Sequence, residues 1–260
     1  MLKVIDTHAH LDEMENLESA LSKAKDAGVT AIVAVGSNHE SNQKTMEICL
    51  KYPSFVYPAL GLHPWGLGNV ESNQIDRTIK FIEGRTTDIT AIGEIGLDYD
   101  KRVVKMAPKE LQKEVMKRLL ALAREYKKPA IIHSRYAWRD SFELVKAAGI
   151  KKAVFHWFTG FSSVLKDILD AGYFISATPA AEYHEEHRRA IKETPLDRLL
   201  LETDCPVTYG REVKYRSEPA DILRSLRAVA AIKGSGEVAI AEQTTHNATR
   251  FFGLASTQIS

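Results

Sequence analysis

Eight short apolar segments alternate along this chain with segments whose apolar residues recur at helical spacing, and this alternation restricts the fold more than any other feature. The expected strands are residues 4–10, 31–35, 55–60, 89–92, 129–133, 152–156, 173–176 and 199–202. The expected helices are residues 17–27, 41–50, 75–82, 111–126, 141–148, 163–171, 185–193, 219–233 and 238–252. Strands that alternate with helices pair in parallel through right-handed crossovers. This α/β pattern predicts a (β/α)8 TIM barrel with C-terminal helices, and an open doubly wound sheet is the alternative.

The length and composition fit this prediction. The chain has 260 residues, about the size of one barrel, so we expect residues 1–260 to form a single domain. It contains no apolar run of membrane-spanning length and no basic and apolar leader, which favours a cytoplasmic protein without a membrane partner. Cys49 and Cys205 do not form a Cys-x-x-Cys pair, so a disulfide is not expected. Because 35 basic residues face 34 acidic ones, a nucleic acid would have to be bound by local contacts.

Histidines and carboxylates occur where five of the expected strands end. These residues are His8, His10, Glu94, His133, His156 and Asp204. The carboxyl ends of barrel strands meet on one face, and this set suffices for two divalent ions, with Glu94 as the bridge. The expected ligands are His8, His10, Glu94 and Asp204 for one ion, and Glu94, His133 and His156 for the other. Two ions about 3.5–4 Å apart activate water for hydrolysis, and Asp204 could accept its proton.

Four more polar residues lie close to these strand ends. His63 follows the third strand and could contact substrate or phosphate, or it could cap its turn. Arg135 could bind a phosphate with its guanidinium or pair with a loop carboxylate. Asp98 is grouped with these substrate contacts, although it could instead orient a histidine ligand or cap its loop. Glu202 is expected to face the barrel interior near the ions, and we include it among the catalytic candidates.

Several short motifs resemble the successive signatures of the TatD family of metal-dependent deoxyribonucleases, which belongs to the amidohydrolase-like barrels. They are residues 6–12 (DTHAHLD), 61–64 (GLHP), 93–99 (GEIGLDY), 133–135 (HSR), 156–160 (HWFTG), 202–206 (ETDCP), 218–219 (EP) and 244–248 (TTHNA). The resemblance covers residues 4–253. It implies the barrel fold, one or two metal ions, the same ligand set, and removal of nucleotides from DNA or RNA ends.

The expected activity is therefore that of a 3'-5' exonuclease on single-stranded DNA ends. The alternative is a metal-dependent ester or amide hydrolase, such as an aminoacyl-tRNA deacylase, and a barrel that has lost its metals and activity is a third reading. Histidine ligands favour Zn, Mn, Co or Ni, whereas Mg alone would be atypical.

The chain departs from the family pattern at three places. Trp157 replaces a small residue and either stacks on a base or packs at the barrel rim, with packing favoured. Val207 stands where a tyrosine is common, and Ser217 stands where an asparagine is usual. These changes leave the ligand set intact and bear on substrate preference. The remaining histidines are expected at the surface: His39, His184, His187 and His246.

Overall fold

The computed structural model describes residues 2–68 and 70–254, and its centre is a sheet of eight parallel strands in sequence order. The strands are β1 (Val4–Ala9), β2 (Val29–Val35), β3 (Val56–Leu62), β4 (Ala91–Asp98), β5 (Ala130–Arg135), β6 (Ala153–Phe155), β7 (Phe174–Ala177) and β8 (Leu199–Leu201). The segment that follows β8 joins the sheet to β1. Ala9 forms a parallel bridge with Cys205, and the Asp204 N–H donates to the carbonyl of His8 at 2.9 Å. The predicted (β/α)8 barrel is confirmed, and the open sheet is excluded.

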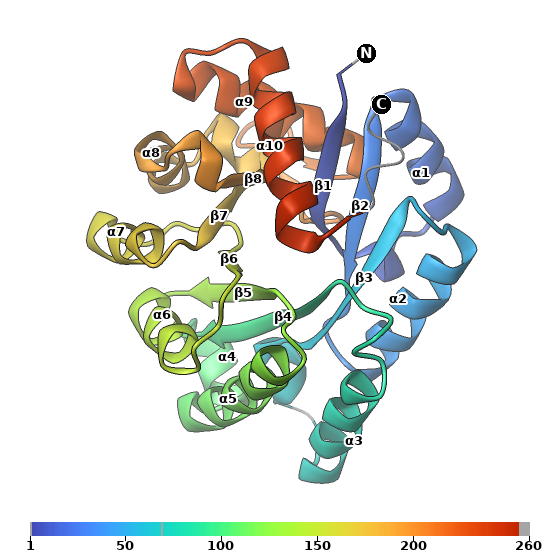
Figure 1. The fold of residues 1–260 in the computed structure, drawn as a ribbon, viewed down its shortest axis with the longest axis vertical. Helices are drawn as coiled ribbons and strands as arrows, with labels where there is room; N and C mark the ends of the chain where they lie inside the picture. The colour runs from blue at the N-terminus through green and yellow to red at the C-terminus, as the bar shows by residue number, and fades with distance from the viewer. Residues whose placement is uncertain (1, 69, 255–260) are drawn as a thin grey trace.

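Helices surround this barrel in the order of the chain, as Figure 1 shows. They are α1 (Leu17–Asp26), α2 (His39–Lys51), α3 (Ser72–Glu83), α4 (Lys101–Met106), α5 (Lys109–Glu125), α6 (Trp138–Ala147), α7 (Ser162–Asp170), α8 (Glu185–Glu193), α9 (Ile222–Lys233) and α10 (Glu237–Phe252). The short helix α4 was not expected. It is separated from α5 by Pro108, because the residue before a proline is disfavoured in the helical region.

Helix α10 closes the amino-terminal end of the barrel. Its Phe251 and Phe252 pack with the inward-facing Val33 and Ile131 in one buried cluster. The ammonium group of Lys152, just before β6, donates to the carbonyls of Arg250 and Phe251 at 2.9 and 3.2 Å. With this end filled by apolar side chains, the carboxyl ends of the strands are the part of the barrel interior where a polar site can lie.

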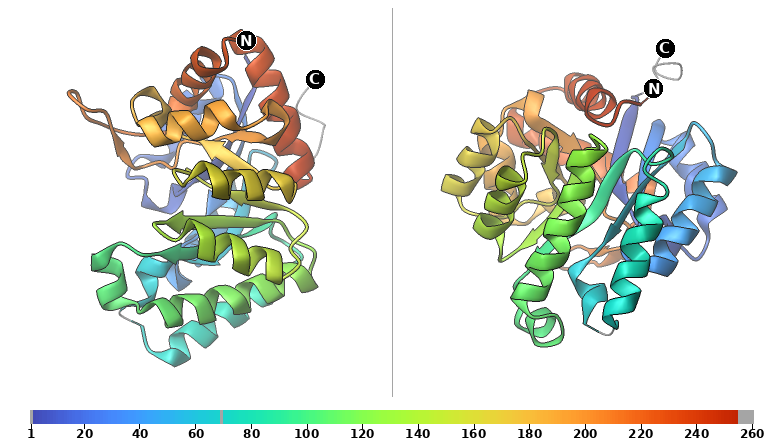
Figure 2. Two further views of the ribbon diagram at one scale, coloured as in Figure 1. Left: turned by 90° about the vertical axis from the view of Figure 1, so that its left-hand side faces the viewer. Right: turned by 60° about the horizontal axis from the view of Figure 1, so that its bottom comes forward.

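Two features of the strands differ from the sequence-based expectation. Strand β4 continues to Asp98, so Glu94 lies inside the strand rather than after it. A hairpin of β9 (Thr208–Tyr209) and β10 (Tyr215–Arg216) follows β8, and it projects from the body of the molecule in Figure 2.

His187 is fully buried and not at the surface. Its Nδ1–H donates to the carbonyl of Phe158 at 3.0 Å, while its Nε2 accepts from the Thr178 N–H at 3.1 Å. Burial lowers the pKa of His187 to about 4, so the ring is a neutral structural link between α8 and the loops that follow β6 and β7.

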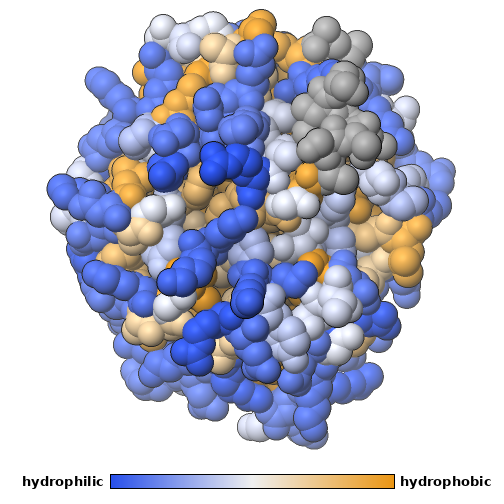
Figure 3. Space-filling model, viewed as in Figure 1, coloured by the Kyte–Doolittle hydropathy of each residue, from blue (hydrophilic) through white to orange (hydrophobic). Residues whose placement is uncertain are grey.

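Both cysteines are unpaired, as the sequence analysis expected. Cys49 and Cys205 are buried free thiols. None of the helices within residues 2–68 and 70–254 combines the length and the apolar character needed to span a bilayer. The face shown in Figure 3 is mostly hydrophilic, with hydrophobic residues in scattered patches.

Candidate metal centre

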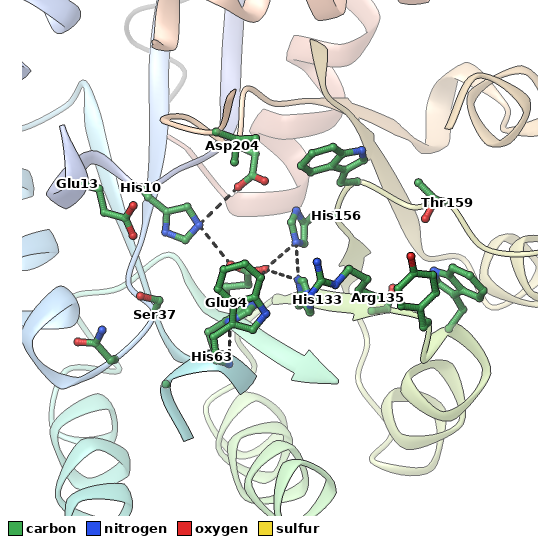
Figure 4. A pocket seen from close by; sticks show the side chains of 18 of the residues that line it. His10, Glu13, Ser37, His63, Glu94, His133, Arg135, His156, Thr159 and Asp204 are labelled. Atoms are coloured by element: carbon green, nitrogen blue, oxygen red, sulfur yellow. Dashed lines mark hydrogen bonds and ion pairs between the residues drawn. The ribbon is translucent and has the colours of Figure 1, made fainter. Parts of the chain in front are cut away.

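A pocket of about 860 Å³ opens at the carboxyl ends of the strands. His10, Glu94, His133, His156 and Asp204 line it, and Figure 4 shows these side chains converging around Glu94. His8 lies within this group and is fully buried. The structure thus brings together all six residues that the sequence analysis selected as ligands, from five strands or the segments that follow them.

One donor cluster consists of the Nε2 atoms of His8 and His10 with one oxygen each from Glu94 and Asp204. The two ring nitrogens are 3.3 Å apart, and each lies 3.4 Å from Glu94 Oε2. Asp204 Oδ1 lies 3.4 Å from His8 and 3.5 Å from His10. Four donors held about 2.1 Å from a common zinc ion in a tetrahedron are separated by about 3.4 Å. The spacing of these donors therefore fits a transition-metal ion.

A second cluster surrounds the other oxygen of Glu94. Oε1 lies 2.7 Å from His156 Nε2 and 3.0 Å from His133 Nδ1, and these two nitrogens are 3.3 Å apart. His63 Nε2 is 3.5 Å from the same oxygen. Glu94 thus presents one oxygen to each cluster, as a bridging ligand would. The distances of 2.7 and 3.0 Å are hydrogen-bond lengths, so the second cluster is more contracted than the first.

The charges in these clusters are set by the contacts between them. Burial raises the pKa of Glu94, but the neighbouring imidazoles, His156 above all, more than reverse this and hold it well below its usual range. Burial lowers the pKa of His10 and of His156, yet the facing carboxylates raise both well above 6.5. The metal-free site therefore holds ionised carboxylates beside protonated imidazoles, and a divalent cation can replace these protons.

Asp98 lies behind His133 and does not reach the pocket. Its carboxylate is fully buried, and its Oδ2 is 3.1 Å from His133 Nε2. Because a carboxylate only accepts, His133 keeps a proton on Nε2, and Nδ1, which faces Glu94, is the atom that would bind a metal ion. Asp98 also accepts from Trp65 Nε1 at 2.7 Å and from Arg135 Nε at 3.0 Å. Of the roles expected for Asp98, the structure favours orientation of a histidine over contact with substrate, because the carboxylate is sealed from solvent.

Glu202 stands in a similar position behind His156. Its Oε1 lies 3.4 Å from His156 Nδ1 and accepts from the Trp157 N–H at 2.9 Å. The side chain is buried and faces the interior as predicted, but it is not among the residues that line the pocket. We therefore treat Glu202 as a residue that positions His156, and not as one that contacts the reacting atoms.

His63 and Arg135 both line the pocket. His63 Nδ1 accepts from the Trp65 N–H at 3.1 Å, and burial lowers the pKa of this imidazole to about 3. The neutral ring must then carry its proton on Nε2, so His63 offers a donor rather than a metal ligand. Arg135 pairs with Asp98 through Nε at 3.0 Å, and its Nη2 lies 3.8 Å from Asp100 Oδ2, so it makes the expected pairing with loop carboxylates, while phosphate binding stays a prediction.

Two buried amides that the sequence analysis missed support these ligands. The side chain of Asn42 in α2 makes paired hydrogen bonds with the N–H and carbonyl of Gly61. A Cβ on Gly61 would lie 2.2 Å from the carbonyl oxygen of Glu94, so only glycine allows β3 to pass this close to the backbone of β4. Gln112 in α5 likewise holds the N–H and carbonyl of Asp98. The sequence could have indicated Asn42 and Gln112, because each is a polar residue on the apolar face of a predicted helix.

The backbone is strained where three strands lead into the pocket. Tyr136, Trp157 and Asp204 have positive φ values of 55°, 41° and 50°, and all three line the cavity. Such conformations are costly for residues with side chains and cluster at functional sites. The half-buried Trp157 ring packs against Tyr209, with ring centres 5.4 Å apart, which agrees with the favoured packing role.

A closed barrel with four histidines and two carboxylates converging at the carboxyl ends of its strands defines the class of metal-dependent barrel hydrolases. Within that class the chain belongs to the TatD related DNase family, whose model matches residues 5–253. This confirms the resemblance drawn from its motifs.

Individual relatives extend this comparison over nearly the whole chain. Human "Deoxyribonuclease TATDN3" is 35% identical over 259 residues, covering 96% of this chain and 94% of the relative. "3'-5' ssDNA/RNA exonuclease TatD" of Erwinia tasmaniensis is 29% identical, covering 91% and 93%. The crystal structure of YJJV, a TatD homologue from Escherichia coli, has a TM-score of 0.87 and 26% identity, covering 97% and 98%.

Proposed function

We propose that this protein is a metal-dependent nuclease that removes nucleotides from single-stranded ends of DNA or RNA in the 3'-5' direction. The observation that carries the proposal is the position of Glu94, which presents one carboxylate oxygen to each of two histidine clusters at the base of an open pocket. Family membership and the names of the relatives support a nucleic acid as substrate. We also propose a cytoplasmic location.

The proposed centre holds two divalent ions from the group Zn, Mn, Co, Ni and Mg. His8, His10 and Asp204, whose donor atoms lie close enough to share an ion, would hold one. His133 and His156 would hold the other, with Glu94 shared between them. Such ions, when bound, lower the pKa of water and offset the negative charge that develops around phosphorus.

The protein groups around the centre have separate tasks. Asp204, which lines the cavity, is the proposed acceptor of the proton from the attacking water. The His63 Nε2–H and the terminal nitrogens of Arg135 are the proposed donors to phosphate oxygens. Asp98 and Glu202 hold the two histidines of the second cluster in their orientation.

The first test uses metal-stripped protein and a 5'-labelled single-stranded oligonucleotide, resupplied separately with Zn, Mn or Mg. We expect stepwise shortening that requires metal and stops at a blocked 3' end. Glu94→Ala should abolish it, whereas Glu83→Ala, an exposed residue at the end of α3, should not. Cleavage of an ester or aminoacyl substrate while DNA and RNA oligonucleotides both stay intact would support the alternative hydrolase and refute the nuclease.

A further inference from the structure

Exposed aromatic side chains gather at one side of the pocket mouth. Among the described residues, the exposed aromatics at this mouth are Trp65 (58% accessible), Tyr136 (61%) and Phe161 (65%). Tyr126 is also exposed, at 38%, but it lies just after α5, away from the mouth. Trp65 and Tyr136 line the pocket, and Phe161 contacts Trp138, which also lines it. Large apolar rings are normally buried, so a group of them around a polar cavity indicates a binding surface.

The rings of Tyr136, Trp138 and Phe161 form a continuous row that we call the aromatic row. The ring centres of Tyr136 and Trp138 are 5.9 Å apart, and those of Trp138 and Phe161 are 5.4 Å apart. Gly160 makes room for this row, since a Cβ there would lie 2.5 Å from Trp138 Cγ. Tyr136 is held in the left-handed region at φ 55°, a costly conformation for a tyrosine and one of the kind that clusters at functional sites.

A cation and a second exposed ring lie beside the aromatic row. Arg135 precedes Tyr136 in the chain, and its guanidinium carbon is 5.3 Å from the centre of the Trp65 ring. Trp65 is fixed by the hydrogen bond from its Nε1 to Asp98. In Figure 4, Arg135 lies on the side of Glu94 opposite to His10 and Glu13. The phosphate backbone of a nucleic acid would therefore be attracted to the Arg135 side of the pocket and repelled by the carboxylate of Glu13 on the other side.

We propose that the aromatic row and Trp65 form a stacking site for the bases of a single-stranded nucleic acid whose terminal phosphodiester lies at the metal centre. This inference rests on the proposed function for the identity of the ligand. Stacking on aromatic rings is sequence-tolerant because every base offers a π face, and it requires bases that are not paired in a duplex. The site would thus select single strands over duplexes while leaving base sequence largely unread.

Binding can be measured without hydrolysis. The chain has three tryptophans, Trp65, Trp138 and Trp157, and all of them line the pocket, so intrinsic fluorescence reports on this site. Full-length protein in excess chelator is titrated with an oligothymidine of about ten nucleotides and with an abasic oligomer of the same length. We expect the intact oligomer to quench the fluorescence and to bind roughly 5- to 100-fold more tightly than the abasic one.

Two variants test the aromatic row, and a third is the matched control. Tyr136→Gly removes an exposed ring and suits the left-handed backbone, and Phe161→Ala removes a second exposed ring, so neither threatens folding. Both should weaken binding of the intact oligomer about fivefold or more and leave abasic binding unchanged. Tyr126→Ala alters an exposed tyrosine just after α5, near the amino-terminal end of the barrel, and should behave as wild type.

The outcomes separate this inference from the nuclease proposal. If the abasic oligomer binds as tightly as the intact one, or if both variants retain wild-type binding, the stacking site is refuted even when DNA is hydrolysed. If the intact oligomer binds with the expected preference but no metal supports hydrolysis, the stacking site stands and the nuclease proposal fails.

Discussion

The substitution Asp98→Asn should disable the metal centre without touching a metal ligand. Each carboxylate oxygen of Asp98 accepts two hydrogen bonds. Oδ2 accepts from Trp65 Nε1 and His133 Nε2. Oδ1 accepts from Arg135 Nε and from the Asp100 N–H. An asparagine has one acceptor oxygen, so in either orientation its amide group faces two donors. Hydrogen bonds to a charged group contribute about 1.5–3 kcal/mol each. Loss of two should therefore lower the free energy of unfolding by about 3–6 kcal/mol.

His133 can relieve part of this conflict by moving its proton from Nε2 to Nδ1. The moved proton would occupy the lone pair that faces Glu94 and His156, so the second cluster would lose a ligand. Removal of a carboxylate behind a histidine ligand typically weakens metal binding 10- to 100-fold. We expect a loss of that size in calorimetric titration with Zn or Mn, together with reduced nuclease activity.

The matched control is Asp100→Asn, two residues away. Asp100 caps the start of α4 by accepting from the Arg102 N–H, a role that asparagine also fills, and its carboxylate does not contact His133. Metal affinity should remain at the wild-type value. Metal binding by Asp98→Asn within about threefold of wild type would refute the orientation of His133 by Asp98.

Further predictions concern packing and protonation. Gly61→Ala should lower the free energy of unfolding by about 1–3 kcal/mol and reduce activity, because the added Cβ meets the backbone of Glu94. The control is Gly84→Ala, whose added Cβ would make only ordinary van der Waals contacts. Equal losses of unfolding free energy in the two variants, measured by urea unfolding, would contradict the close approach at Gly61. The metal-free protein should lose stability as pH rises above 6.5, because the raised pKa values of His10 and His156 stabilise the fold only while these rings are protonated. Metal affinity should rise over the same range, since fewer protons compete. A melting temperature in chelator that increases from pH 6.5 to 9 would oppose this assignment.

The sequence by itself determined the barrel and the group of ligands. Alternation of strands and helices leaves few topologies, and in a closed parallel barrel every strand delivers its carboxyl end to the same face. For this reason His8, Glu94 and Asp204, which are far apart in the chain, could be assigned to one centre from their positions after expected strands. The bounds of individual elements were less secure, as the extension of β4 to Asp98 shows.

The tertiary structure alone decided how the residues around the ligands divide their roles. Asp98 and Glu202 appear in the sequence as polar residues near strand ends, yet burial places both behind histidines. Likewise, the buried His187 is a structural link because α8 packs it against carbonyl and amide groups of the loops after β6 and β7. Such roles depend on which nitrogen faces which oxygen across neighbouring elements. That geometry is set by how strands and helices pack together, and local sequence periodicity carries no record of it.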